Sequence, residues 1–317
     1  MRWVSAAEID EALDFPTLVD ALAQAFSGGF TAPKRHHHAI ERAGAATATH
    51  LLMPAWTTRD AQGGAWLGTK IVNVFPDNGR RGLPAVLGLY VLQSGATGEP
   101  LAAMDGARLT HWRTAAASAL AARFLARSDA RRLLMVGAGA LAPFLVRAHA
   151  AVRPIEEVTV WNHRRAGAEK LAAALSGRGW RIRIAEDLET AARAADVISC
   201  ATLSGAPLIA GAWLAPGQHL DLVGAFNLEM READDEALRR ARIFVDTDAA
   251  LTEGGDVALA LRSGAIDRGH VVGDLAALCR GAPGRTGRQE ITLFKSVGAA
   301  IEDLAAAMLV WRKLAPR

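Results

Sequence analysis

The feature that most constrains this chain is a glycine-rich turn between an apolar run and a helical pattern. Residues 133–136 read as a strand, G-x-G-x-x-A follows over 137–142, and an Ala-rich helical pattern covers 144–152. A second strand-like run, 157–161, begins about twenty residues after the turn, as a βαβ unit requires. In such a unit the glycines let the backbone approach a pyrophosphate, which then faces the helix N-terminus. This context favours a nucleotide-binding unit over an ordinary glycine-containing turn.

The end of the second run indicates which nicotinamide cofactor the unit would take. An acidic residue there binds the ribose 2′-hydroxyl of NAD, whereas a basic residue suits the 2′-phosphate of NADP. The sequence reads Asn162-His163-Arg164-Arg165, with no acid before Glu169. Asn162 and Arg164 could hold a phosphate by charge-assisted hydrogen bonds, although a solvated basic turn gives the same pattern. We therefore expect NADPH, with NADH as a weaker alternative.

Composition and charge exclude several classes of protein. The chain has 317 residues, 51% of them hydrophobic and 22% charged, which suits two globular domains. A net charge of +3 is too small to indicate a nucleic-acid surface, and no run of about eighteen apolar residues indicates a membrane span. The first residues carry acids and lack the apolar core of a signal peptide, so we expect a cytoplasmic protein. Cys200 and Cys279 are expected to be buried reduced thiols.

The pattern of elements predicts an α/β protein with two kinds of sheet. Residues 1–30 predict one helix, with Ser5 and Glu8 forming a capping box at its start. Strand-like runs without intervening helices then predict a mostly antiparallel sheet. After an Ala-rich helix over 110–127, residues 130–280 alternate strand and helix, which predicts a doubly wound parallel sheet, and the C-terminal segment becomes helical after Gly298. The expected strands are 35–40, 47–53, 65–74, 86–92 and 101–104, then 158–161, 181–185, 196–201, 219–223 and 242–245.

Two cations are candidates for chemistry on a substrate. Lys70 lies inside the apolar run 66–72, where a charge is costly unless it faces a site. Burial can lower the pKa of such a lysine and make it a general acid or base, but a snorkelling edge-strand lysine is an equal alternative. Arg113 opens the Ala-rich helix near the expected domain junction. It suits either a bidentate clamp on a substrate carboxylate or a structural interdomain pair.

A run of three histidines follows Arg35. Strand alternation sends His36 and His38 to one face, and His37 with Arg35 to the other. No cysteine or acidic ligand lies at metal-ligand spacing, so we expect residues of a sheet surface or substrate pocket and no metal site.

Several short stretches together resemble the ornithine cyclodeaminase/μ-crystallin family, over nearly the whole chain. They are LMPA at 52–55, GTK at 68–70, LTHWRTAA at 109–116, the turn at Gly137, and FKSVG at 294–298. The resemblance implies a homodimer formed through a substrate-binding domain of residues 1–112 and 293–317, with a Rossmann-type cofactor domain of residues 113–292 inserted. It also implies that Arg35, Lys70 and Arg113 gather around a substrate carboxylate, with Lys70 near the reacting carbon and nitrogen.

One departure from the family bears on the reaction. Cyclodeaminases carry a catalytic Asp shortly after a strand ending in Val-Gly, where this chain has Phe226. Cyclisation with loss of ammonia needs a base, whereas reducing a preformed cyclic imine needs one hydride and one proton. The sequence of residues 224–232 resembles that of bacterial Δ1-pyrroline-2-carboxylate/Δ1-piperideine-2-carboxylate reductases of this family. The turn at residues 161–164 resembles that of μ-crystallin, an NADPH-dependent ketimine reductase.

The sequence therefore predicts an NADPH-dependent cyclic ketimine reductase that forms L-proline or L-pipecolate. An ornithine or lysine cyclodeaminase, an open-chain amino-acid dehydrogenase and a non-catalytic binder of small molecules remain as alternatives. Lys70 is the expected catalytic residue, and the expected substrate-binding residues are Arg35, Met53, Lys70, Arg113 and Phe226. The expected cofactor-binding residues are Arg113, Thr114, Gly137, Gly139, Ala140, Leu141, Asn162, His163, Arg164, Thr202, Val223, Gly224, Ala225 and Ser296.

Overall fold

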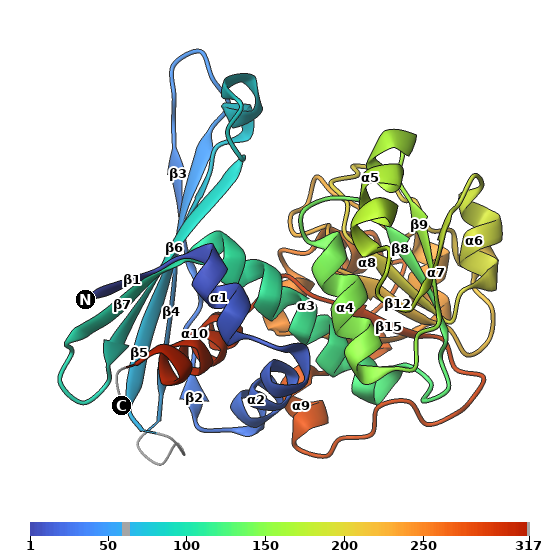
Figure 1. Ribbon diagram of the computed structural model, residues 1–317. Helices are drawn as coiled ribbons and strands as arrows, with labels where there is room; N and C mark the ends of the chain where they lie inside the picture. The colour runs from blue at the N-terminus through green and yellow to red at the C-terminus, as the bar shows by residue number, and fades with distance from the viewer. Residues whose placement is uncertain (59–63, 316–317) are drawn as a thin grey trace. The chain divides into compact units, whose positions relative to one another are not determined.

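The computed structural model describes residues 1–58 and 64–315, which form two compact units (Figure 1). Residues 1–114 and 299–317 make the first unit, and residues 115–298 make the second. The sequence assigned residues 293–317 to the first domain. In the structure the strand Thr292–Lys295 pairs inside the second unit's sheet, so the chain returns to the first unit only at Ala299.

The first unit contains a seven-stranded, mostly antiparallel sheet. Its order is β1-β7-β6-β5-β4-β2, with β3 also paired to β4, and only β1 and β7 run parallel. The sequence-based expectation of an antiparallel α+β unit is confirmed. The strands are β1 (Arg2–Val4), β2 (Phe30–Thr31), β3 (His36–Ile40), β4 (Ala48–Thr57), β5 (Trp66–Val74), β6 (Val86–Ser94) and β7 (Pro100–Asp105).

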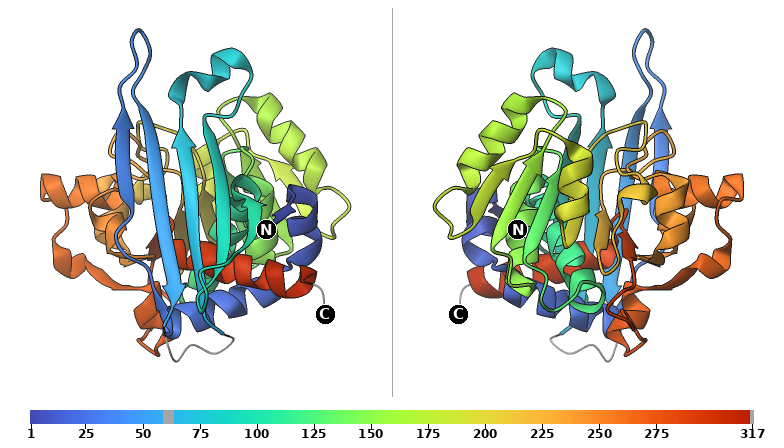
Figure 2. Two further views of the ribbon diagram at one scale, coloured as in Figure 1. Left: turned by 90° about the vertical axis from the view of Figure 1, so that its left-hand side faces the viewer. Right: turned by 90° about the vertical axis from the view of Figure 1, so that its right-hand side faces the viewer.

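Helices cover one face of this sheet. The helix α10 (Ala300–Leu314) packs on β4, β5 and β6, and in the left view of Figure 2 it passes, in red, behind the blue and teal strands. The single helix expected over residues 1–30 is wrong, because the chain forms α1 (Ala6–Ala12) and α2 (Phe15–Ser27). The break has a local cause: the Asp14 carboxylate accepts the Thr17 N–H at 2.9 Å and starts a second helix. The predicted capping box of Ser5 and Glu8 is present.

The second unit is built on an eight-stranded parallel sheet of order β10-β9-β8-β11-β12-β15-β13-β14. The strand order reverses between β8 and β11, which makes this point the topological switch of a doubly wound fold. The predicted fold class is thus confirmed, although β14 and β15 were not among the expected strands. The strands are β8 (Arg132–Val136), β9 (Glu157–Trp161), β10 (Arg181–Ile184), β11 (Val197–Cys200), β12 (His219–Leu222), β13 (Arg242–Val245), β14 (Val271–Asp274) and β15 (Thr292–Lys295).

The helices α4 to α9 of the second unit alternate with these strands along the chain, and one long helix precedes them. The helix α3 (Gly106–Leu125) connects the two units in sequence and begins earlier than the expected residue 110. The others are α4 (Ala142–Val152), α5 (Arg165–Leu175), α6 (Leu188–Ala194), α7 (Asp235–Arg240), α8 (Gly255–Ser263) and α9 (Leu275–Cys279).

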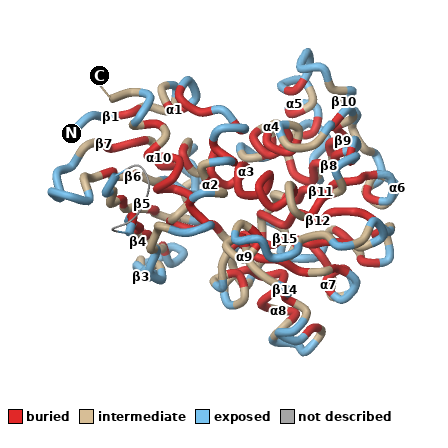
Figure 3. The backbone as a smooth tube through the Cα atoms, turned by 90° about the horizontal axis from the view of Figure 1, so that it is seen from below, coloured by how far each residue is buried: buried red, intermediate tan, exposed pale blue. Residues whose placement is uncertain are grey.

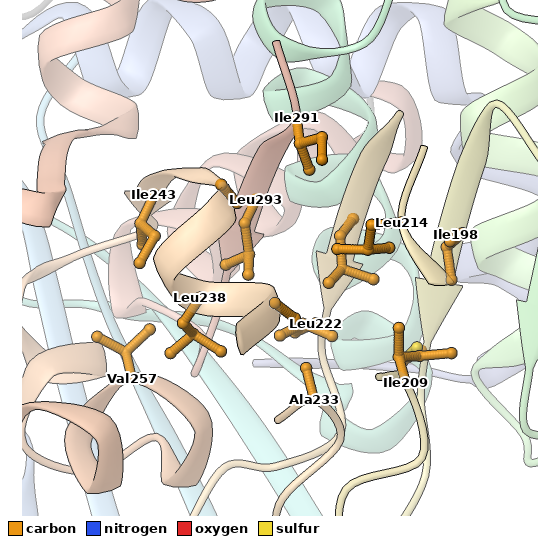
Figure 4. Packing of buried hydrophobic residues seen from close by; sticks show 14 of the residues in the cluster. Ile198, Ile209, Leu214, Leu222, Ala233, Leu238, Ile243, Val257, Ile291 and Leu293 are labelled. Atoms are coloured by element: carbon orange, nitrogen blue, oxygen red, sulfur yellow. The ribbon is translucent and has the colours of Figure 1, made fainter. Parts of the chain in front are cut away.

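The core of the second unit lies along its central strands. All residues of β11, β12 and β15 are buried, and these strands are drawn red in Figure 3. Aliphatic side chains from neighbouring strands and from α7 and α8 meet there, as Figure 4 shows for Leu222, Leu238, Ile243, Val257 and Leu293. Continuous apolar burial of this kind is typical of a parallel sheet covered on both faces.

A polar network lies inside this core. The fully buried Asp221 accepts hydrogen bonds from Ser199 Oγ at 2.7 Å and Ser118 Oγ at 2.9 Å, and lies 3.1 Å from His149 Nε2. On the same strand, His219 Nδ1 is 3.0 Å from Thr292 Oγ1. Burial lowers the pKa of His219 to about 3, so this imidazole is neutral in the folded protein.

Two further findings concern the thiols and the membrane. Cys200 and Cys279 are both free, but only Cys200 is fully buried, and the half-buried Cys279 differs from the expectation. Burial raises the pKa of the Cys279 thiol to about 11. Within residues 1–58 and 64–315, no helix combines the length and apolarity needed to cross a bilayer.

Candidate active site

Lys70 lies in the middle of the first sheet and faces its helix-covered side. The register sets it opposite Met53 on β4 and Tyr90 on β6, and the exposed fractions of these three residues are 3%, 4% and 0%. The snorkelling alternative for Lys70 is wrong, because β5 has a neighbour on both sides and the side chain does not reach solvent.

Two acids on α10 hold the buried cations. Asp303 Oδ1 lies 3.1 Å from Lys70 Nζ and 3.0 Å from Arg113 Nε, and Glu302 Oε2 lies 2.7 Å from Arg113 Nη1. Glu302 and Asp303 are fully buried and Arg113 is 5% exposed. Two positive and two negative charges therefore form a balanced cluster inside the first unit. The interdomain pair considered for Arg113 is not what the structure shows, since both of these partners belong to the same unit.

Burial and charge set the protonation of this cluster. Burial, followed by the nearby Arg113 guanidinium, lowers the pKa of Lys70 to about 8, and Asp303 offsets part of this effect. Burial acts to lower the pKa of Arg113 as well, but Asp303 and Glu302 raise it above its usual value, so Arg113 stays charged. Lys70 is thus an ammonium that can release its proton near neutral pH, beside a permanent cation.

Tyr90 completes the row of side chains around Lys70. A Cβ atom on Gly68 would lie 1.9 Å from Tyr90 Oη, so the ring needs a glycine at that position. Burial, and then the Asp303 carboxylate, raise the pKa of Tyr90 well above its ordinary value. Tyr90 Oη and Asp303 Oδ2 are buried and have no hydrogen-bond partner among the described residues. Both atoms are therefore unused polar groups buried beside Lys70.

Arg35 and the histidines lie at the edge of this sheet. Arg35 immediately precedes β3, and continuing the register of β3 by one residue sets it opposite Met53, on the Lys70 side. His38 is opposite His50 on the other side, with ring centroids 6.4 Å apart. The three histidines 36–38 are exposed, as a sheet surface requires. Within the described parts of the chain, no three His, Cys, Asp or Glu side chains are grouped so that they could hold a metal ion.

The expected cofactor residues of the second unit follow five neighbouring strands. Asn162 follows β9, Gly137 follows β8, Thr202 lies just beyond β11, Val223 follows β12 and Ser296 follows β15. In parallel strands these carboxyl ends lie along one edge of the sheet, where open α/β folds bind their ligands.

The geometry at the switch point fits a dinucleotide. Gly137 has φ +102°, and a Cβ there would lie 2.7 Å from the Ala201 carbonyl oxygen. A Cβ on Gly139 would meet nothing within 4 Å, so the backbone there is open to a ligand. At the start of α4 the Ala142 and Phe144 N–H groups donate to the Gly139 and Leu141 carbonyl oxygens, and Pro143 has no N–H, so a pyrophosphate would meet the backbone of the turn before the helix. The buried Ser296 Oγ also lacks a partner among the described residues.

The basic turn after β9 is partly ordered by its own hydrogen bonds. Asn162 Nδ2 donates to the Arg164 carbonyl at 2.8 Å, and Arg165 pairs with Glu169 and Glu186 at 3.0 and 3.6 Å. Arg164 is exposed and has no carboxylate partner among the described residues. Its guanidinium is therefore available to an anionic group.

The structure divides the predicted site residues between its units. The first unit carries Arg35, Met53, Lys70, Arg113 and Thr114. The second carries Phe226 and the cofactor residues from Gly137 to Ser296. Phe226 is 38% exposed and lies in the loop after β12, where it provides an aromatic surface but no acid or base.

Sequence reasoning missed the acids that support these groups. Glu302 and Asp303 hold Lys70 and Arg113, and Glu232 holds the loops after β11 and β12. A signal was present for the first two, because they are adjacent acids on the otherwise apolar first half of a helix. Fully buried charges are rarely found without partners, so such a pair points to buried cations.

Comparisons with known proteins show the family of this chain. Residues 5–316 match the model of the ornithine cyclodeaminase/mu-crystallin family. The Delta(1)-pyrroline-2-carboxylate reductase of Paracoccus denitrificans is 39% identical over 317 residues, which cover 99% of this chain and 97% of the relative.

Two solved structures are similar over almost the full length. Thermococcus litoralis Delta(1)-pyrroline-2-carboxylate reductase in complex with NADH and L-proline matches with a TM-score of 0.92 at 33% identity, covering 99% of this chain and 97% of the other. An archaeal alanine dehydrogenase dimer with bound NAD matches with a TM-score of 0.89 at 30% identity, covering 98% and 95%. The resemblance noted in the sequence is confirmed: this chain belongs to the ornithine cyclodeaminase/mu-crystallin family.

Proposed function

We propose that this protein is an imine reductase. It reduces cyclic ketimines that carry a carboxylate on the imine carbon: Δ1-pyrroline-2-carboxylate gives L-proline, and Δ1-piperideine-2-carboxylate gives L-pipecolate. The observation that carries the proposal is the buried cluster of Lys70 and Arg113, which offers a transferable proton and a fixed positive charge side by side. Relatives named for the same reduction support it.

Lys70 supplies the proton. Reduction adds a hydride to the imine carbon and a proton to the nitrogen, so the C=N bond becomes a CH–NH bond. A pKa of about 8 keeps the Lys70 ammonium protonated at neutral pH yet able to transfer its proton to the more basic amine nitrogen that forms. Asp303 orients Nζ from 3.1 Å.

Arg113 binds the substrate carboxylate. Its Nε and Nη1 bond to Asp303 and Glu302, which leaves Nη2 as the donor for a substrate oxygen. The two carboxylates hold the guanidinium in one orientation before substrate arrives, which reduces the entropy lost on binding. Arg35, on the same side of the sheet as Lys70 by strand register, provides a second cation for this carboxylate.

The second unit binds the nicotinamide cofactor, which when bound supplies the hydride. The turn of Gly137, Gly139, Ala140 and Leu141 receives the pyrophosphate at the start of α4. NADPH is preferred, because Arg164 has no carboxylate partner among the described residues and no acid in the turn repels a 2′-phosphate. Thr202, Val223, Gly224, Ala225 and Ser296 surround the nicotinamide end.

Phe226 argues against a cyclodeaminase. Cyclisation of ornithine with loss of ammonia needs a base near the substrate, and a phenyl ring cannot accept a proton. The same ring can pack against the apolar carbons of a cyclic imine.

The proposal includes a cytoplasmic homodimer. An archaeal alanine dehydrogenase of similar structure is a dimer, and Ile40 and Trp56 are large apolar side chains exposed on the first sheet. These features support self-association through that sheet.

A substrate comparison tests the proposed reaction. Oxidation of NADPH, and separately of NADH, is followed by the loss of reduced-nicotinamide absorbance with each cyclic imine and with pyruvate plus ammonia. Fast turnover of the imines alone is expected. Turnover only with pyruvate and ammonia would make the protein an open-chain amino-acid dehydrogenase. Cofactor binding without turnover of any of these substrates would refute the proposed reduction.

A further inference from the structure

The Glu232 carboxylate joins the loops that follow two neighbouring strands. Its Oε1 accepts hydrogen bonds from Thr202 N at 2.7 Å and Thr202 Oγ1 at 2.9 Å, just beyond β11. Its Oε2 accepts hydrogen bonds from Gly224 N at 2.7 Å and Ala225 N at 3.3 Å, after β12. Glu232 is fully buried, so these four donors replace the water that the carboxylate loses.

The same carboxylate closes the loop that carries Phe226. Glu232 stands at the end of this loop, and its side chain reaches back to Gly224 and Ala225 at the start. The approach is so close that a Cβ on Gly224 would lie 2.5 Å from Glu232 Oε1 and 2.1 Å from the Thr202 carbonyl oxygen. The position of Phe226 therefore depends on a bond made at the base of its loop.

A second acid, Asp256, holds the backbone at Glu232 and is itself paired with a lysine. Asp256 Oδ1 accepts the N–H groups of Glu232 at 2.7 Å and Ala233 at 3.0 Å, and its Oδ2 lies 3.2 Å from Lys295 Nζ. All three charged side chains are fully buried. Such a buried cluster costs desolvation energy: burial raises the pKa of Glu232 to about 7, although Lys295 acts to lower it. An apolar core would fill this space without that cost, so the arrangement indicates a positioning role.

We propose that Glu232 is a positioning residue that fixes the Thr202 loop and the Phe226 loop around the nicotinamide end of the cofactor. This inference rests on the proposed function, in which the protein binds a nicotinamide cofactor. It adds which residues hold each of the two ends of that cofactor. The pyrophosphate and adenosine end is bound by the Gly137 turn and the turn after β9, whereas the hydrogen bonds of the Glu232 carboxylate to described residues go to Thr202, Gly224 and Ala225. The nicotinamide end lies against the loops that Glu232 joins.

The variant Glu232→Gln breaks one half of this arrangement. A carboxamide keeps one acceptor oxygen, but its NH2 group must face either the Thr202 donors or the Gly224 and Ala225 donors. Donor faces donor on that side, and one loop is released. Asp256 and Lys295 remain as a balanced pair, so the variant is not left with an uncompensated buried charge.

Two ligands separate the proposal from a general loss of structure. The dissociation constants of the tighter-binding reduced cofactor and of its adenosine fragment (NADPH with 2′,5′-ADP, or NADH with ADP) are measured by calorimetry for wild type and variant. We expect Glu232→Gln to weaken the whole cofactor about tenfold while the fragment changes less than twofold. Equal weakening of both, or no weakening of the cofactor, overturns the proposal.

A matched control uses another carboxylate that closes a loop in the same unit. Glu290 accepts the Thr286 N–H at 2.7 Å and pairs with Arg242, but it precedes β15 and so lies at the amino edge of the sheet. In Glu290→Gln the ratio of the affinity for the whole cofactor to the affinity for its adenosine fragment should stay at the wild-type value. A ratio that falls as far as in Glu232→Gln would count against the proposal.

Thr202→Val keeps the test open if Glu232→Gln does not fold. This change removes one of the four hydrogen bonds to Glu232 and leaves the backbone N–H in place. Thr202→Val should also lower the ratio of cofactor affinity to fragment affinity, but by less than Glu232→Gln does. An unchanged ratio overturns the proposal. Both measurements record binding without any imine present, so failure of the proposed imine reduction would not alter this result. A wild-type chain that bound neither cofactor would instead refute the proposed function itself.

Discussion

Asp303→Asn should move the pH at which activity is lost. Asp303 Oδ1 lies 3.1 Å from Lys70 Nζ, and its negative charge acts to raise the pKa of Lys70. Without that charge, the pKa of Lys70 would lie below its value of about 8. The variant leaves Lys70 and Arg113 with one carboxylate, Glu302, between them. Because both cations are buried, the cheapest response is for Lys70 to lose its proton.

The size of the change follows from the geometry. An opposite charge at this distance typically shifts a pKa by about 1 to 3 units, which corresponds to about 1 to 4 kcal/mol. The Lys70 pKa in Asp303→Asn should therefore lie between about 5 and 7, down from about 8. A proton donor is inactive above its pKa, so the alkaline limb of the pH profile should move to lower pH by the same amount.

The assay is kcat/KM for a cyclic imine between about pH 5 and pH 10, because this ratio reports the pKa values of the free enzyme. The imine itself titrates, but identically for every variant, so the difference between profiles isolates the protein. Glu302→Gln is the matched control: the Glu302 hydrogen bond goes to Arg113 rather than Lys70, and its effect on the Lys70 pKa is smaller. That variant should raise KM and move the limb less. An unmoved limb in Asp303→Asn, or a larger movement in Glu302→Gln, would refute the assignment of the proton to Lys70.

Three further predictions test other parts of the molecule. Lys70→Met should lower kcat by about 10²- to 10⁴-fold, because the variant has lost the proton donor. The Kd for NADPH should stay unchanged, because Lys70 and the Gly137 turn lie in different units. Near-wild-type turnover would remove Lys70 from the mechanism. Arg164→Ala should raise the KM for NADPH about tenfold relative to the KM for NADH. Arg165→Ala is the control and should leave this ratio unchanged, because Glu169 and Glu186 already pair with the Arg165 guanidinium. Equal effects of the two variants would place recognition of the 2′-phosphate elsewhere. His219 has a folded pKa of about 3, so its contribution to stability is fully present above its unfolded pKa of about 6.5 and is lost as the pH falls toward 3. Wild type should thus lose about 2 kcal/mol through this group between about pH 7.5 and pH 5, and urea unfolding of His219→Gln should show a smaller loss by that amount; identical losses would contradict a neutral buried His219.

Local signals in the sequence determined many of the helices and strands, and much of the fold class. Ser5 and Glu8 predicted their capping box, the Gly137 turn predicted the first βα connection of the parallel sheet, and alternation placed His36 and His38 on the same face of β3. These predictions succeed because hydrogen bonds between residues three or four apart, and alternation along a strand, depend only on the neighbouring sequence. The break at Asp14 was also a local signal, an N-cap followed by Pro16, which the continuous apolar stripe concealed.

The tertiary structure decided which charges meet. Asp303 lies 233 residues beyond Lys70 in the chain, and although the adjacent acids of α10 point to buried cations, the local sequence does not show which cations they meet. Glu232 likewise meets Thr202 only because β11 and β12 are adjacent in the sheet. The pKa of Lys70 depends on burial and on two carboxylates from another part of the chain. The sequence could therefore name Lys70 and Arg113 as candidates, whereas their protonation and their partners follow only from the packing of distant segments.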